Sequence, residues 1–103
     1  MKRTKSMVYR PTQESNELVL YAENTGDLYR NSIQPAIESL AKKYRKGVYD
    51  KNRAVDLYYY IATEAAKMYF REFGYHFSVT DRYTAAVELE EGYFENVLKC
   101  AKN

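Results

Sequence analysis

The sequence predicts an all-α fold: a small bundle of three main helices in which the helix over residues 51–73 is central. Three observations lead to this prediction. Residues 51–73 have apolar side chains over an arc of roughly 220° at 100° per residue. Apolar stripes of the same period run through residues 18–44 and 79–101. Residues that commonly cap helices stand at the ends of these stretches.

Residues 1–13 show no apolar periodicity, are rich in basic side chains and end near Pro11. Such a stretch cannot bury enough apolar surface to offset the entropy of ordering. We therefore expect a flexible basic arm over residues 1–13 and a single helical domain over residues 14–103. The arm's cations are Lys2, Arg3, Lys5 and Arg10.

The stripe over residues 18–44 continues in phase across two helix breakers, the Asn24-Thr25-Gly26-Asp27 segment and Pro35. We expect either one bent helix that starts at residue 14 or two in-line helices over residues 14–24 and 27–46. A short strand over residues 18–22 is the alternative, although no partner strand is evident. Four cations precede Gly47 in the last turn, where they complement the helix dipole: Lys42, Lys43, Arg45 and Lys46.

Asp50 is the expected N-cap of the 51–73 helix, and Gly74 is expected to end it in a left-handed conformation. The loop before Asp50 is short, so this helix should pack antiparallel to the preceding one. Ser78 or Thr80 should begin the last helix, over residues 79–101.

Glu90 falls near the middle of the apolar arc of the last helix, where a carboxylate loses hydration. One interpretation is that a tyrosine hydroxyl or an arginine inside the fold satisfies it, since the chain has 12 tyrosines. The other is that the stripe faces a partner that presents a cation. A comparison of unfolding midpoints between the parent and Glu90→Gln separates the two.

Tyr60 is an aromatic residue on the polar side of the 51–73 helix, among Arg53, Lys67 and Arg71. Aromatic and arginine side chains are enriched at binding hot spots. The ordinary alternative is that the N-terminal arm or the leading helix covers Tyr60.

Other chemistry has little support in the sequence. His76 and Cys100 are the only histidine and cysteine, and no orienting motif accompanies them. We expect no cofactor, no metal site and no enzymatic activity. One cysteine fits a reducing compartment, and no apolar run is long enough to cross a bilayer. The expected location is the cytoplasm.

The chain resembles small uncharacterised proteins of tailed phages and prophages over roughly residues 16–85. The likeness lies in Glu17-Leu18, Tyr21-Ala22-Glu23-Asn24, Gly26-Asp27-Leu28-Tyr29-Arg30, Pro35, Lys42-Lys43, Lys46-Gly47, Tyr49-Asp50 and Glu72-Phe73-Gly74. The resemblance implies a viral accessory protein, a class that commonly binds host or defence machinery.

Two functions are therefore expected. The first is a non-enzymatic protein-binding module, for example an inhibitor, whose partner is a host or phage protein or a second copy of the chain. Its candidate contact residues are Tyr60, Arg53, Lys67, Arg71 and Glu90. The alternative is a nucleic-acid binder that uses the basic arm and the cluster at residues 42–53, with an affinity that falls steeply with salt. The net charge of +2 favours the first.

Overall fold

The computed structural model describes residues 11–103, and every regular element in this part of the chain is helical. The elements are α2 (Gln13–Asn24), α3 (Gly26–Leu28), the π-helical turn η1 (Tyr29–Ile33), α4 (Gln34–Arg45), α5 (Lys51–Phe73) and α6 (Val79–Lys102). The all-α prediction is confirmed, and residues 18–22 are helical rather than a strand. The predicted basic arm falls mostly on residues 1–10, which lie outside the described residues.

The predicted caps of the two long helices are present. Asp50 accepts a hydrogen bond from the Asn52 N–H at 3.3 Å, and Gly74 ends α5 with a φ of 73°. Ser78 and Asp81 form a reciprocal capping box at the start of α6, at 3.0 and 3.1 Å. These local signals explain why both helices begin where the sequence analysis placed them, and why α5 ends where predicted.

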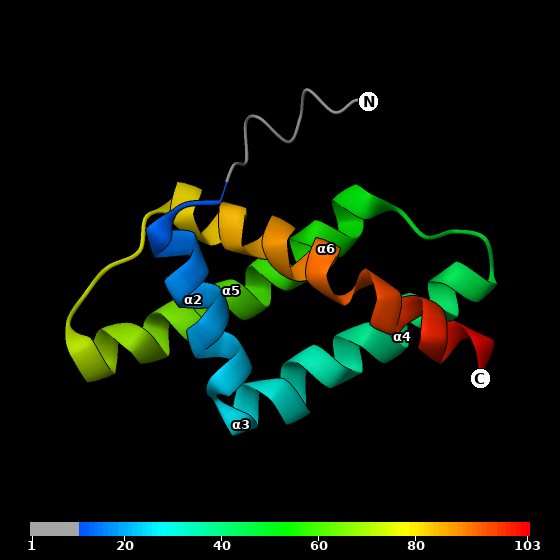
Figure 1. The fold of residues 1–103 in the computed structure, drawn as a ribbon, viewed down its shortest axis with the longest axis horizontal. Helices are drawn as coiled ribbons and strands as arrows, with labels where there is room; N and C mark the ends of the chain where they lie inside the picture. The colour runs from blue at the N-terminus through cyan, green and yellow to red at the C-terminus, as the bar shows by residue number, and fades with distance from the viewer. Residues whose placement is uncertain (1–10) are drawn as a thin grey trace.

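The first half of the chain differs from the prediction, because it forms two helices that are not in line. Thr25 is extended, with φ −92° and ψ 104°, and interrupts the helical backbone between α2 and α3. Figure 1 shows α2 and α4 meeting at an angle beside α3. Residues 11–103 therefore form four helices where three were expected: α2, the continuous helix from Gly26 to Arg45, α5 and α6.

Pro35 does not end this second helix, but it changes the helix just before it. Proline has no N–H, and its ring crowds the carbonyl four residues earlier. The chain widens into η1, in which the Gln34 N–H donates to the carbonyl of Tyr29. A one-turn π-helix is a common way to absorb such a disruption.

Both α5 and α6 contact every other main helix, but α6 packs more extensively than α5, the helix that was expected to be central. Helix α6 packs against α5, α4 and α2, whereas α4 and α5 contact each other only slightly. Ala85 and Ala86 on α6 are fully buried, as is Ala65 on α5. Small side chains allow helices to approach closely, and this favours the extensive α5–α6 contact. The expected antiparallel packing of the 27–46 and 51–73 helices is correspondingly minor.

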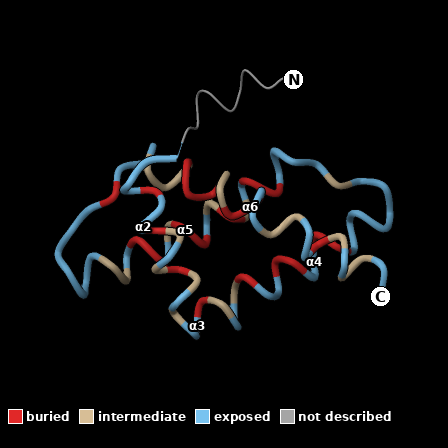
Figure 2. The backbone as a smooth tube through the Cα atoms, in the orientation of Figure 1, coloured by how far each residue is buried: buried red, intermediate tan, exposed pale blue. Residues whose placement is uncertain are grey.

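Burial follows this arrangement (Figure 2). One apolar cluster joins α4, α6 and the first half of α5, and a second joins α2, α6 and the second half of α5. The Cα positions span only 16 Å in their thinnest direction, so few helices are covered on every side. Phe70 and Phe73, expected in the buried arc of α5, are 41% and 59% exposed. No helix in the described part of the chain is long and apolar enough to cross a membrane.

Candidate functional site

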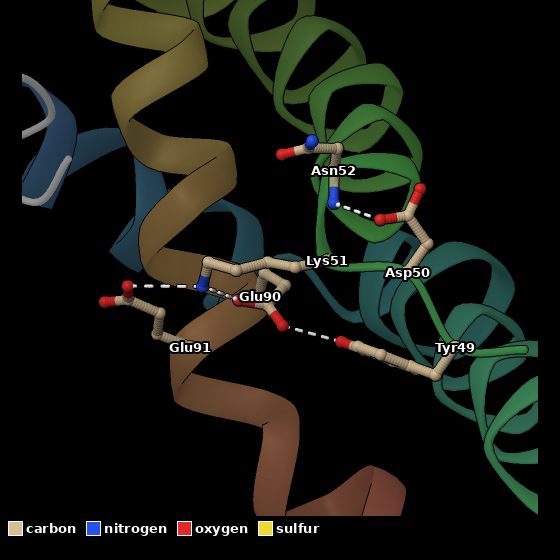
Figure 3. Close-up of polar contacts among 6 residues, drawn as sticks. All are labelled: Tyr49, Asp50, Lys51, Asn52, Glu90 and Glu91. Atoms are coloured by element: carbon tan, nitrogen blue, oxygen red, sulfur yellow. Dashed lines mark hydrogen bonds and ion pairs between the residues drawn. The ribbon is translucent and has the colours of Figure 1, made fainter. Parts of the chain in front are cut away.

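Glu90 is buried in the middle of α6, with a relative exposure of 4%. The Tyr49 hydroxyl donates to its Oε2 at 2.6 Å, and the Lys51 ammonium donates to its Oε1 at 2.6 Å. Figure 3 shows the two donors reaching Glu90 from the loop before α5 and from the first residue of α5. Lys51 also pairs with Glu91 at 3.4 Å. The contacts thus fasten the start of α5 to α6.

The charge of Glu90 affects the groups around it. Burial, the hydrogen bond to Glu90 and its negative charge raise the pKa of the Tyr49 hydroxyl above its ordinary value. Burial and the Glu90 charge also raise the pKa of Tyr58, whose buried hydroxyl has no hydrogen-bond partner among residues 11–103. Burial lowers the pKa of Lys51, but its contacts with Glu90 and Glu91 outweigh this, and the net shift is upward.

These contacts match the intramolecular interpretation of Glu90, with a lysine in place of the expected arginine. Both carboxylate oxygens are engaged within the fold, and removing one partner of a buried charge pair is costly. Contact with a partner protein would require the loop before α5 to move. Glu90 is therefore not part of the exposed binding surface.

Tyr60 lies on the opposite, solvent-facing side of α5 and is 73% exposed. Arg53, Lys67 and Arg71 are also exposed, and each stands 7 or 11 residues from Tyr60, within about 20° around the helix. The structure therefore brings the four predicted contact residues onto one face. The leading helix α2 does not cover Tyr60. The alternative in which the N-terminal arm covers it falls on residues that lie outside the described part of the chain.

Ion pairs on this face are long and exposed. Arg53 lies 3.8 Å from Asp50, and Lys67 lies 3.6 Å from Glu64. Exposed pairs of this kind contribute about 0–1 kcal/mol, so they leave the cations available for other contacts.

A hollow of about 280 Å³ adjoins the Tyr60 face near the end of α5. Lys67 and Arg71 line it together with His76 and Arg82, and no acidic side chain among residues 11–103 does. The His76 ring stacks on Phe70 with 4.0 Å between centroids. Sequence reasoning did not connect Arg82 or His76 with this face, because the turn at residues 74–78 brings them there. The arrangement suits an anionic group.

The basic cluster at the end of α4 is partly used inside the fold. The Arg45 guanidinium donates to the carbonyls of Cys100 and Ala101 at 3.2 and 3.4 Å, and so caps the end of α6. Lys42, Lys43 and Lys46 are exposed. The other predicted nucleic-acid contacts, Lys2, Arg3, Lys5 and Arg10, lie outside the described residues.

His76 and Cys100 are not brought together. His76 precedes α6 and Cys100 lies near its end, about 30 Å away at 1.5 Å per residue. Within residues 11–103, no group of three His, Cys, Asp or Glu side chains is arranged to hold a metal ion.

Tyrosine hydroxyls link helices in a way that the sequence analysis did not foresee. Besides Tyr49, tyrosines in the described part of the chain donate to glutamates of other helices, among them Tyr93 to Glu23 at 3.0 Å, Tyr69 to Glu17 at 2.6 Å and Tyr21 to Glu72 at 2.9 Å. Part of the high tyrosine content therefore serves inter-helix hydrogen bonds at the edge of the core.

Comparison of the chain with protein-family models, with curated proteins and with solved structures finds no match. The resemblance to phage proteins therefore stays a prediction.

Proposed function

We propose that the protein is a non-enzymatic binding module that engages another protein through the exposed face of α5, with Tyr60 at the centre of the contact. The observation that carries the proposal is the 73% exposure of Tyr60 on a helix face that also presents Arg53, Lys67 and Arg71. A tyrosine can contribute a large contact area at a low entropic cost.

The cations indicate the chemistry of the partner. Lys67 and Arg71 line the adjoining hollow with Arg82, and none of the carboxylates in the described part of the chain lines it. A partner surface that presents carboxylates opposite this end of α5 would complement it. Asp56 and Glu64 lie on the same face of α5 as Tyr60. The charge complementarity is therefore confined to the end of α5 beside the hollow.

The biological setting is part of the proposal. A small phage-encoded protein that acts in the host cytoplasm would bind a host or defence complex in a fixed ratio and inhibit it by occupying its surface. Nothing in such a role requires a catalytic centre or a cofactor.

Site-specific photocrosslinking in host cells tests the proposal. A photoreactive amino acid in place of Tyr60 is expected to give a discrete covalent adduct with one protein. The same amino acid in place of Val48, which is 59% exposed in the loop between α4 and α5, is the control and should not give that adduct. The same adducts from both positions, or none from position 60, would contradict the proposed surface.

A further inference from the structure

A second surface lies between α2 and the C-terminal half of α5, where a groove of about 780 Å³ opens. Its apolar part is an aromatic cluster in which Tyr69 lies 5.1 Å from Tyr21 and 4.6 Å from Phe73, measured between ring centroids. Leu20 and Phe73 border the groove and are 57% and 59% exposed. Two large apolar side chains so exposed in one groove mark a surface suited to an apolar partner.

Acidic side chains predominate beside this groove, although the charge of Arg71 also acts on Tyr21. α2 has three glutamates and no lysine or arginine between Gln13 and Asn24. Glu17 and Glu72 accept hydrogen bonds from the Tyr69 and Tyr21 hydroxyls, which hold the carboxylates in place without neutralising them. Within residues 11–103, the second oxygen of each carboxylate has no hydrogen-bond partner and is available to a cation.

We propose that this groove binds a segment of a partner protein in which lysine or arginine side chains flank leucine- or phenylalanine-like ones. The apolar side chains of that segment contact Leu20 and Phe73, and its cations pair with Glu17 and Glu72. Charge complementarity is the basis for this choice of occupant, because Glu17 lines the groove, Glu72 accepts from the Tyr21 hydroxyl at its border, and no basic side chain of residues 11–103 lines it.

The groove is independent of the Tyr60 face. At 100° per residue, Tyr69 and Phe73 lie roughly 180° and 140° around α5 from Tyr60. Figure 1 shows α2 crossing α5, and residues of these two helices line most of the groove. A variant of either surface should therefore leave binding at the other unchanged, and the two proposals can fail separately.

Two synthetic peptides test the inference with the full-length chain. The first peptide is ten residues long, and lysine alternates in it with leucine and phenylalanine. The second peptide, its twin, has the same sequence with glutamate in place of every lysine. We expect saturable binding of the lysine peptide by fluorescence anisotropy, at least tenfold tighter than binding of its twin. The NMR shift changes should centre on Leu20, Tyr21 and Phe73.

Variants then separate groove binding from general attraction to an acidic surface. Leu20→Ser and Phe73→Ser should each weaken binding of the lysine peptide at least fivefold, and Glu17→Gln should reduce its salt dependence. Val48→Ser alters an exposed apolar residue outside the groove and should have no effect. Circular dichroism confirms that each variant is folded.

Four results would overturn the inference. The first is an absence of saturable binding of the lysine peptide up to about 1 mM, a concentration that corresponds to a very weak affinity. The second is equal binding of both peptides, and the third is binding that neither groove variant weakens. The fourth is occupation of the groove by the chain itself. The last would be seen as nuclear Overhauser contacts from Leu20 or Phe73 to residues 1–10, or as self-association that Phe73→Ser abolishes.

Discussion

Replacement of Glu90 by glutamine tests the main polar contact of the fold. The substitution keeps the shape of the side chain and an oxygen that can accept the Tyr49 hydroxyl, but it removes the negative charge that faces Lys51 at 2.6 Å. The amide nitrogen of glutamine is a donor, so it cannot replace the acceptor that Lys51 loses.

The magnitude follows from the burial of the two partners. A hydrogen bond between charged groups contributes about 1.5–3 kcal/mol, and breaking a fully buried pair costs about 3–5 kcal/mol. Glu90 is buried, but the Lys51 side chain is 53% exposed and its ammonium can be hydrated after the change. We therefore expect a loss of about 1.5–3 kcal/mol, the lower of these two ranges. For a domain of this size, that lowers the unfolding midpoint by roughly 5–15 °C.

Thermal unfolding followed by circular dichroism measures the effect, and Glu91→Gln is the matched control. Glu91 also pairs with Lys51, but at 3.4 Å and with a side chain that is 52% exposed, so its replacement should cost less than about 0.5 kcal/mol. A Glu90→Gln midpoint within about 2 °C of the parent would refute the reasoning, as would equal effects of the two substitutions.

Three further predictions concern stability. Gly92→Ala should raise the free energy of unfolding in urea by about 0.5–1 kcal/mol, because Gly92 is an exposed position within α6 where an added Cβ meets no atom within 4 Å; an unchanged or lower value would contradict this. Ser78→Ala should lower it by about 1 kcal/mol through loss of the capping box, whereas Thr80→Ala, one residue inside the helix, serves as a control with a smaller expected effect. Burial and Glu90 raise the pKa of the Tyr49 hydroxyl above 10 in the folded state. The protonated hydroxyl therefore stabilises the folded state below pH 10, and this stabilisation is lost as the pH rises further. Urea unfolding from pH 9 to 12 should therefore show a fall in stability that is smaller in Tyr49→Phe, and equal slopes would argue against it.

Local signals in the sequence were sufficient to place the helices. Asp50, Gly74 and Ser78 act through backbone hydrogen bonds and φ values of their immediate neighbours, which a linear pattern records directly. The same holds for the position of Tyr60 among Arg53, Lys67 and Arg71, because helical spacing alone determines which residues share a face.

Relations between helices were harder to predict. Thr25 and Pro35 both read as breakers, yet only Thr25 ends a helix, because η1 absorbs the proline. The more extensive packing of α6 depends on how closely each helix approaches its neighbours. The apolar arc of a single helix does not specify these distances. The exposure of Phe73 likewise depends on where the neighbouring helices lie. The fold does not cover the whole apolar arc of α5, and Phe73, which belongs to that arc, lies in the groove beside α2.

The most direct test of the central proposal is the affinity of the crosslinked partner for Tyr60→Ala, measured by isothermal titration calorimetry with Val48→Ala as control. Tyr60 is exposed, so its loss should change the unfolding free energy by no more than about 0.5 kcal/mol. The account predicts that Tyr60→Ala weakens binding by at least about 30-fold, equivalent to about 2 kcal/mol, while Val48→Ala binds like the parent. An unchanged affinity of a folded Tyr60→Ala would contradict it.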